Sequence, residues 1–309
     1  MDNSLYFIGV DHGNRVIKGI SGESKSRYLS GIAQHEFEPL SKSNLLILND
    51  TYYTIGENRI NLQFNKTETE DFFILTLPCI ADKFKDQGVR SGNVILGVGL
   101  PISAFNLKEE FRKYFIRDLV KFNYEGIEYC VNIKDTHVFP QSYSAFLTDF
   151  NSYKDISQIV VFDWGSATTD IIVVERGRLI TSSAICLNNG LIFLYKEIQQ
   201  DLIKRNIKIS ETQIEEVIKG DTPIFVSKEI QELIIDKTRK YVQRVISEVR
   251  ENNVEMEINP VLFVGGGSQL LEKYINEVKG VSVCAFMDEY SNAKGYEMLA
   301  RNAATKNSR

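Results

Sequence analysis

Residues 159–174 read Ile-Val-Val-Phe-Asp-Trp-Gly-Ser-Ala-Thr-Thr-Asp-Ile-Ile-Val-Val, and this stretch decides the fold. Two β-branched runs, Ile159–Phe162 and Ile171–Val174, flank a turn of small residues with an aspartate at each end. This pattern is typical of a β-hairpin with a polar tip. Small residues let backbone N–H groups surround an anion, and a carboxylate at the end of a buried strand can hold a metal ion. The stretch therefore predicts a phosphate-binding loop with its own magnesium carboxylate, Asp163.

A second stretch near the N-terminus repeats this plan. The apolar run Leu5–Val10 ends in Asp11-His12-Gly13-Asn14, and Arg15–Ile20 returns as a second strand. Aspartate and glycine are common turn residues, so either copy alone also fits an unrelated hairpin. Two copies about half a chain apart predict a duplicated α/β domain with a ligand between the halves.

Composition narrows the class of protein. The chain of 309 residues is 43% apolar and 25% charged, which is a globular composition with enough length for two domains. A net charge of -5 argues against strong direct binding of nucleic acid, so any such partner is expected to act through an adaptor. We expect no signal peptide and no membrane span, because no apolar run approaches about 18 residues. The scattered cysteines are predicted to be buried thiols in a reducing cytoplasm: Cys79, Cys130, Cys186 and Cys284.

The first half of the chain has an α/β order of elements. Leu45–Leu48 and Tyr52–Ile55 predict a hairpin inside an inserted piece, and Asn93–Leu100 predicts a buried strand. Asn106 and Glu109 have the spacing of a capping box. The helix that follows is predicted to bury Phe111, Phe115, Leu119 and Phe122. Glu128–Ile133 reads as another strand, and Pro140 suits the start of a short helix.

The second half continues with a strand at Leu179–Ala184 and a helix after Gly190, whose missing side chain allows close approach of a ligand. Ser210 and Gln213 predict a capping box for a short helix that ends at Gly220. The next helix is amphipathic and spans Lys228–Arg250. Its charged face is interpreted mainly as solvated, with three cations in reach of a nucleotide base or ribose: Lys237, Arg239 and Lys240.

The strand Pro260–Val264 runs into three glycines and a serine: Gly265, Gly266, Gly267 and Ser268. A loop without Cβ atoms can lie flat against a planar ligand, and the next helix offers N–H groups to an anion. The pattern matches neither a dinucleotide fingerprint nor a P-loop.

Together these pieces resemble, in a fixed order, the actin, Hsp70 and sugar kinase ATPase superfamily. The motifs are Asp11-x-Gly13 with Lys18, then Pro140-Gln141, then Asp163-x-Gly165-x-x-Thr168-x-Asp170, then Gly265-Gly266-Gly267, and finally Asn292-Ala293-Lys294-Gly295. Within the superfamily, the compact length and the Gly-Gly-Gly-Ser loop are most similar to ParM-like bacterial plasmid-segregation actins.

The resemblance implies an actin-like fold, that is, a ribonuclease H-like duplicated two-domain α/β fold with a nucleotide cleft between the domains. Domain I would span residues 1–145, with a small inserted subdomain at about 30–90, and would be completed by a C-terminal helix at about 292–309. Domain II would span residues 146–291.

The resemblance also implies a function. Such proteins bind ATP with Mg²⁺, polymerise head to tail into filaments, hydrolyse ATP upon assembly and segregate plasmid DNA through a DNA-binding adaptor of the ParR type. We expect a cytoplasmic protein that contacts neither nucleic acid nor membrane directly.

Roles follow position by position from the matched motifs. Asp11 and Asp163 are expected to surround the metal ion, mainly through water, and Gln141 to orient the attacking water. The phosphates are expected to be cradled by Gly13, Asn14, Lys18, Gly165, Ser166, Ala167 and Thr168. The nucleotide is expected to be lined by Gly190, Gly265, Gly266, Gly267, Ser268 and Lys237. Phosphoryl transfer needs mainly positioning and charge neutralisation, which these groups provide.

Four residues of the two hairpins have separate interpretations. Asp170 is predicted to support the loop rather than the metal ion. Ser166 replaces a glycine that is usual in the second phosphate motif. Trp164, the only tryptophan, is predicted to pack in the domain core, and His12 to point away from phosphate.

Two other functions fit the same superfamily. A small-molecule kinase would carry a substrate-binding aspartate and often a Cys/His zinc cluster. A cell-division scaffold would carry a C-terminal amphipathic helix, for which Arg301–Arg309 is too short and polar.

Overall fold

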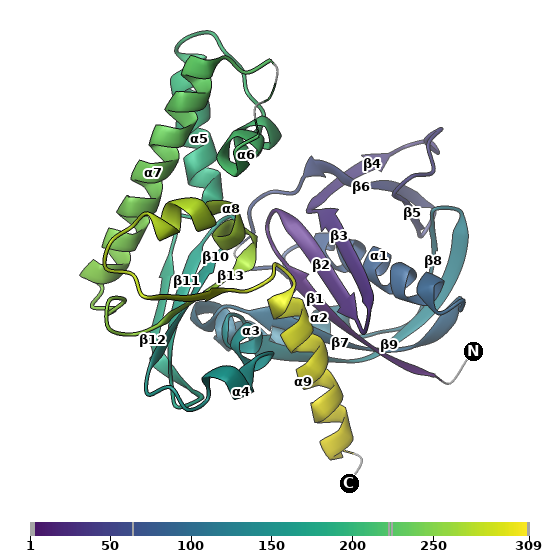
Figure 1. Cartoon of the computed structure of the whole chain (residues 1–309). Coiled ribbons are helices and arrows are strands. Elements are labelled where there is room, and N and C mark those ends of the chain that lie inside the picture. Colours follow the sequence, from purple (N-terminus) through teal and green to yellow (C-terminus); the bar gives the residue numbers. More distant parts are fainter. Residues whose placement is uncertain (1–3, 64, 222, 224, 308–309) are drawn as a thin grey trace. The chain divides into compact units, whose positions relative to one another are not determined.

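The computed structural model describes residues 4–63, 65–221, 223 and 225–307. Residue contacts divide the chain into two compact units. Unit 1 consists of Met1–Thr148 with Tyr290–Arg309, and unit 2 is Asp149–Glu289. Each unit is built on one β-sheet with helices packed against it (Figure 1).

The sheet of unit 1 has the strand order β3-β2-β1-β7-β9-β8-β5-β6-β4. Its strands are β1 (Leu5–His12), β2 (Val16–Ser21), β3 (Ser24–Leu29), β4 (Gly31–His35), β5 (Leu45–Leu48), β6 (Thr51–Arg59), β7 (Ser91–Leu100), β8 (Arg117–Tyr124) and β9 (Ile127–Pro140). β1 pairs in parallel with β7, and β7 with β9. The carboxyl ends of these three strands therefore lie at one edge of the sheet, where Asp11 and Gln141 are found.

The helices that the described residues of unit 1 form are α1 (Asp71–Asp86), the 3₁₀-helix η1 (Ile102–Leu107), α2 (Lys108–Phe115), α3 (Tyr143–Leu147) and α9 (Ser291–Asn307). α1 packs on β1, β2 and β3 and buries its apolar face almost completely. In the segment from 30 to 90, β4, β5 and β6 continue the main sheet, and α1 covers the main core.

α9 lies directly on the strands of unit 1 because glycines face it. A Cβ at Gly9 of β1 would lie 2.0 Å from the carbonyl oxygen of Ala293, and a Cβ at Gly97 of β7 would lie 2.3 Å from that of Tyr296. Gly295 of α9 approaches α3 in the same way. Side chains at these glycines would push the helix off the sheet, so close backbone approach fixes α9 in unit 1.

Unit 2 has a sheet of order β12-β11-β10-β13-β14. Its strands are β10 (Ile159–Trp164), β11 (Thr169–Glu175), β12 (Arg178–Leu187), β13 (Val261–Val264) and β14 (Val283–Phe286). Its helices are α4 (Phe150–Tyr153), α5 (Leu191–Ile203), α6 (Glu211–Lys219), α7 (Lys228–Glu251) and α8 (Gly265–Asn276). The predicted capping box of α6 is present, and α6 ends at Gly220 with a left-handed φ of 96°.

The two units repeat one topology. The order β3-β2-β1-β7-β9 corresponds to β12-β11-β10-β13-β14, with the first three strands antiparallel and the next pairings parallel in both units. The hairpins also share their register, since Asp11 stands opposite Lys18 and Asp163 opposite Asp170. The predicted duplicated α/β fold is confirmed.

Several local predictions were wrong. The helix after Asn106 has no side-chain cap and ends at Phe115. Leu119 and Phe122 belong instead to β8, because that segment pairs with β9 and β5. Pro140 ends strand β9 rather than starting a helix, as the ladder with β7 reaches it. Of the cysteines, only Cys79 is fully buried, and Cys186 and Cys284 are exposed.

Among the described helices, none combines the length and apolar character that crossing a membrane requires.

Replacing Gly9 by alanine is predicted to destabilise the protein by about 1–3 kcal/mol, because a methyl group is forced against the α9 backbone. Gly88→Ala is the control: a Cβ there meets no neighbour, and only its φ of 66° is unfavourable. That variant should lose about 1 kcal/mol at most. Urea unfolding monitored by circular dichroism measures both. A Gly9→Ala protein as stable as the wild type would contradict the close packing of α9 on β1.

Candidate functional site

The turn of the β10–β11 hairpin carries two buried carboxylates. Asp163 and Asp170 stand directly opposite each other, so their side chains share one face of the sheet. Like charges in this arrangement repel and need compensation. The Thr168 hydroxyl donates a hydrogen bond to Asp170 Oδ2 (2.8 Å), which confirms that Asp170 supports the loop.

The carbonyl groups of this loop face α5. Leu191 N donates to the oxygen of Gly165 (3.2 Å), Ile192 N to that of Ser166 (2.9 Å), and Gly190 N to that of Ala167 (3.1 Å). A trans peptide unit directs its C=O and N–H groups to opposite sides. The N–H groups of Ser166, Ala167 and Thr168 therefore point away from α5 as a set of parallel donors.

Gly190 and Gly165 give this loop its shape. A Cβ at Gly190 would lie 2.6 Å from the backbone of Ser166, and a Cβ at Gly165 would lie 2.7 Å from the carbonyl oxygen of Thr168. Gly190 is buried. It supports the loop from behind, a structural role that the sequence did not predict.

Trp164 is fully buried, as predicted for a core residue. Its Nε1 donates to the hydroxyl of Tyr241 (2.9 Å) on α7, and that hydroxyl donates to the backbone oxygen of Asn189 (2.6 Å). The side chain of Asn189 donates to Glu248 Oε2 (2.8 Å), also on α7. α7 thus holds both the end of β10 and the turn that leads into α5.

The three glycines after β13 form the first turn of α8 rather than a free loop. Gly265 has φ 87°, and a Cβ there would lie 2.5 Å from Asp163 Oδ1. A Cβ at Gly267 would lie 2.3 Å from the carbonyl oxygen of Trp164. The partial positive charge of the α8 N-terminus therefore lies beside the Asp163 carboxylate. Ser268 is buried and donates to the oxygen of Val264 (2.5 Å), so its hydroxyl is used inside the helix. Gly266 is the one member of this turn that is partly exposed.

The three cations singled out on α7 all have carboxylate partners. Lys237 lies 3.1 Å from Glu197 and 2.6 Å from Asp201, both on α5. Arg239 pairs with a carboxylate of the α8–β14 connection, and Lys240 with one on its own helix. Lys237 therefore joins α7 to α5, and its contact with a nucleotide stays a prediction.

In unit 1, the β1–β2 hairpin places Asp11 opposite Lys18, and both side chains are buried. A Cβ at Gly13 would lie 2.6 Å from the carbonyl oxygen of Val16, the same geometry as at Gly165 of unit 2. The Asn14 side chain accepts a long hydrogen bond from Gln63 N (3.4 Å), which turns its oxygen toward the segment after β6.

His12 is buried among aromatic rings and points into the core of unit 1, as predicted. Burial lowers the pKa of its imidazole well below the usual value, and the nearby Lys66 ammonium group acts in the same direction. Nε2 lies 2.8 Å from the Thr76 hydroxyl, which itself donates to the oxygen of Phe72. The neutral imidazole therefore carries its proton on Nε2.

Gln141 is held at the carboxyl end of β9. Its N–H donates to the oxygen of Leu100 (2.9 Å), so it continues the ladder with β7. The next residue, Ser142, has φ 65°, which is unfavourable for serine. Asn292 Oδ1 on α9 accepts the Ser142 N–H (3.0 Å) and holds this conformation. Asp11 is the last residue but one of β1, near the same sheet edge and two strand spacings, or roughly 10 Å, across the sheet from β9.

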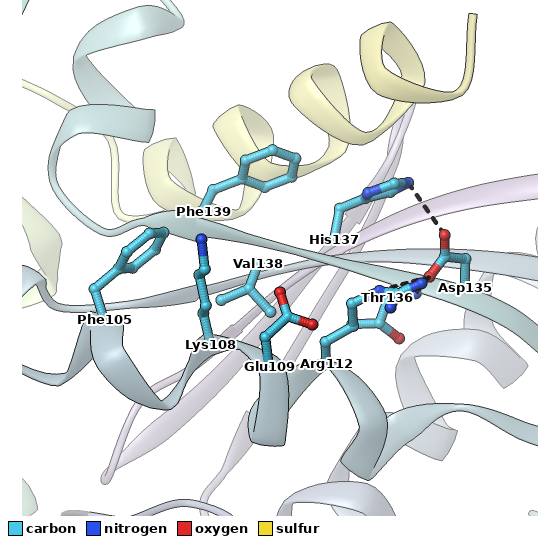
Figure 2. A pocket seen from close by; sticks show the side chains of 9 residues that line it. All are labelled: Phe105, Lys108, Glu109, Arg112, Asp135, Thr136, His137, Val138 and Phe139. Carbon is cyan, nitrogen blue, oxygen red and sulfur yellow. Dashed lines mark hydrogen bonds and ion pairs between the residues drawn. The ribbon is translucent and has the colours of Figure 1, made fainter. Parts of the chain in front are cut away.

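A separate cavity of 360 Å³ lies in unit 1 between η1, α2 and the last part of β9 (Figure 2). There Arg112 donates to Asp135 Oδ1 through Nε (3.0 Å) and Nη2 (2.7 Å), and His137 lies beside Asp135 Oδ2. None of the predicted site residues lines this cavity.

Within the described residues, no group of three or more His, Cys, Asp or Glu side chains is arranged to hold a metal ion. Any ion bound at Asp11 or Asp163 would thus take most of its ligands from water or substrate.

Two family models match the chain. One, described as "Actin like proteins N terminal domain", matches residues 9–143. The other, described as "Archaeal actin homologue MreB-like, C-terminal", matches residues 161–277. The chain belongs to the actin superfamily. Each match contains one of the two aspartate-glycine hairpins, as the resemblance of their motifs implied.

Solved structures of actin homologues share this fold. The archaeal actin homologue Ta0583 in complex with ADP is 19% identical, with a TM-score of 0.76 over 96% of this chain and 99% of that one. A 15-stranded ParM filament from Clostridium botulinum is 19% identical, with a TM-score of 0.76 over 98% and 100%. The actin-like protein Alp7A is 14% identical, with a TM-score of 0.78 over 99% and 98%. No curated protein matches the sequence significantly.

The sequence predicted both hairpin turns and Gln141 but not the contacts that support the unit 2 turn, made by Tyr241, or that hold Ser142 next to Gln141, made by Asn292. Tyr241 and Asn292 act across long separations in the chain. Asn292 opens the last quoted motif, which was its only sequence signal. Tyr241 lies on the apolar face of a long helix and has no local signal.

Asn292→Ala is predicted to destabilise the protein by about 1–3 kcal/mol, because Ser142 N–H loses its acceptor in a strained backbone conformation. Asn302→Ala, an exposed position on the same helix, should change stability by at most about 0.5 kcal/mol. Adding Ser142→Gly to Asn292→Ala should restore part of the loss, since glycine adopts this φ freely. Thermal unfolding of the four proteins measures this, and equal stability of both asparagine variants would refute the role of Asn292.

Proposed function

We propose that the chain is an ATP-binding and ATP-hydrolysing actin-like protein that polymerises into filaments to segregate plasmid DNA through a DNA-binding adaptor of the ParR type. The observation that carries the nucleotide part is the loop Gly165–Thr168, whose three parallel N–H groups face away from α5. Such an array of donors suits the oxygens of a phosphate group. The ADP complex of the archaeal homologue and the ParM filament support nucleotide binding and self-association in this fold.

Each hairpin has a share in holding the phosphates. In unit 2, the amides of Ser166, Ala167 and Thr168 are the donors. In unit 1, the turn at Gly13 and Asn14 offers a second set, with the Lys18 ammonium group as a positive charge behind it. Phosphoryl transfer depends on such positioning and charge neutralisation more than on covalent chemistry by the protein.

We propose that Asp163 of unit 2 and Asp11 of unit 1 each contact magnesium mainly through water. Mg²⁺ usually takes one or two carboxylates together with waters and substrate phosphates, and does not need a cage of protein ligands. In the unit 2 hairpin the cross-strand partner of Asp163 is a second carboxylate, Asp170, whereas in unit 1 Asp11 faces Lys18. Bound there, Mg²⁺ would neutralise charge on the phosphates.

Gln141 is proposed to position the attacking water. An amide is too weak a base to take the proton, but it can accept and donate hydrogen bonds to water. Its backbone is fixed at the end of β9, and Asn292 holds the neighbouring Ser142, so the Gln141 side chain extends from a rigid backbone.

Turnover and assembly can be separated by one substitution. Asp163→Ala is predicted to lower the ATPase rate at least about 100-fold while reducing filament formation less, because it removes charge inside the unit and leaves the surface intact. Asp155→Ala, an exposed aspartate of the same unit, is the matched control and should behave as wild type. Phosphate release and light scattering with Mg-ATP measure the two properties. Normal turnover by Asp163→Ala would overturn the site assignment.

Filament assembly is expected to use exposed apolar side chains on the connecting loops. Leu40, between β4 and β5, is completely exposed (106%), and Phe225, between α6 and α7, is nearly so (96%). Leu40→Asp should raise the protein concentration needed for assembly at least about tenfold and leave nucleotide affinity unchanged.

The control for this surface is Glu38→Asp, an exposed position on the same loop. Pelleting and electron microscopy over a range of protein and salt concentrations measure assembly. Absence of filaments from the wild-type protein under all these conditions would refute the proposed function.

A further inference from the structure

Tyr241 starts a chain of hydrogen bonds that ends in the phosphate loop of unit 2. Its hydroxyl accepts from Trp164 Nε1 (2.9 Å) and donates to the backbone oxygen of Asn189 (2.6 Å). The direction of both bonds is fixed, because an indole N–H can only donate. Burial raises the pKa of the Tyr241 hydroxyl, so it keeps the proton that it gives to Asn189.

The chain continues through two peptide units. The oxygen of the Asn189–Gly190 peptide accepts from Tyr241, and its N–H donates to the oxygen of Ala167 (3.1 Å). The Ala167–Thr168 peptide therefore accepts on its carbonyl side and presents the Thr168 N–H on its other side. Hydrogen bonds linked in this way polarise one another. An anion at the Thr168 amide is thus connected, bond by bond, to the tyrosine hydroxyl and the indole.

α7 holds this turn at a second point as well. The Asn189 side chain donates to Glu248 Oε2 (2.8 Å), two helical turns beyond Tyr241. Both contacts fix the Asn189–Gly190 peptide plane, which in turn sets the plane of Ala167–Thr168. A small rotation of the first peptide would misdirect the Thr168 N–H.

We propose that Tyr241 is a positioning residue for phosphate binding, which sets the orientation and donor strength of the Thr168 amide through Asn189 and Gly190. This inference rests on the proposed function, since it assigns a phosphate group to that amide. It also makes Trp164 a reporter of loop occupancy, because the indole N–H is the far end of the chain. The competing interpretation is that the hydroxyl only stabilises the core of unit 2.

Tyr241→Phe removes the hydroxyl and keeps the ring, and Tyr274→Phe is its matched control. Tyr274 is also buried in unit 2, and its hydroxyl donates to the oxygen of Ile218 (3.3 Å), away from the loop. Each variant removes one buried hydroxyl, which makes two hydrogen bonds at Tyr241 and one at Tyr274, so the affinities are compared at a temperature at which thermal unfolding shows both variants to be fully folded.

The test uses the full chain and measures the affinity for ADP and for AMPPNP, each with Mg²⁺, by calorimetry. Tyr241→Phe is expected to weaken nucleotide binding about three- to tenfold, and Tyr274→Phe less than about twofold. The change of tryptophan emission on adding nucleotide should be present in wild type and Tyr274→Phe and should be reduced at least about twofold in Tyr241→Phe.

Three results would overturn the inference. Equal affinities of the two tyrosine variants would leave only a structural role for Tyr241. If the wild-type protein binds nucleotide by calorimetry but its tryptophan emission does not change, the proposed link from Thr168 to Trp164 is refuted and the proposed function stands. This measurement does not require any variant to fold. Absence of nucleotide binding by the wild type would remove the proposed function and this inference together.

Discussion

The interaction on which the rest of the candidate site depends is the contact between the carbonyl groups of the Gly165–Thr168 loop and the N-terminus of α5. Three consecutive carbonyl groups, from Gly165 to Ala167, accept the first N–H groups of that helix. This contact satisfies donors that a helix start leaves open, and it turns the loop amides outward. It requires a glycine at position 190, since any side chain there would collide with Ser166. One packing contact thereby caps a helix and creates an array of anion donors.

The duplicated hairpins share a backbone but differ in charge. Both have a glycine turn in which a Cβ would strike the carbonyl oxygen three residues later, and both bury the residue before that glycine. The cross-strand partner of the aspartate is Lys18 in unit 1 and Asp170 in unit 2. The first pair is complementary and the second repels. Duplication thus supplied the geometry twice, and a change at one position on each returning strand gave the copies different chemistry.

Much of the fold could be predicted because its signals are local. The alternation of apolar runs and turn residues located both hairpins, and the Ser210–Gln213 box located α6. Prediction failed where pairing with strands that are distant in the sequence decides the secondary structure. Leu119 and Phe122 extend the helical spacing of Phe111 and Phe115 in the sequence, yet pairing with β5 and β9 makes their segment a strand. The glycines after β13 looked like a loop but form a helical turn against Asp163 and Trp164. In the candidate site, the aspartates and glycines of the two hairpins could be predicted because they belong to short local motifs. The supporting contacts of Ser268, Lys237 and Gly190 could not, because they depend on how distant segments pack.

The coupling of α5 and α7 rests on buried contacts more than on charge. On the outside, Lys237 and Arg244 of α7 both reach Glu197 of α5. Arg244 is more than half exposed, and such ion pairs contribute little because water screens them. Inside, the Tyr241 hydroxyl joins α7 to the turn before α5 without solvent, where hydrogen bonds are stronger and their loss leaves buried groups unpaired. Since α5 also carries the loop carbonyls, the position of α7 is transmitted to the loop amides through its interior face. Among the charged residues of α7, Lys237 and Glu248 also bear on α5 and the turn before it, since Lys237 is only 16% exposed and Glu248 accepts a hydrogen bond from Asn189.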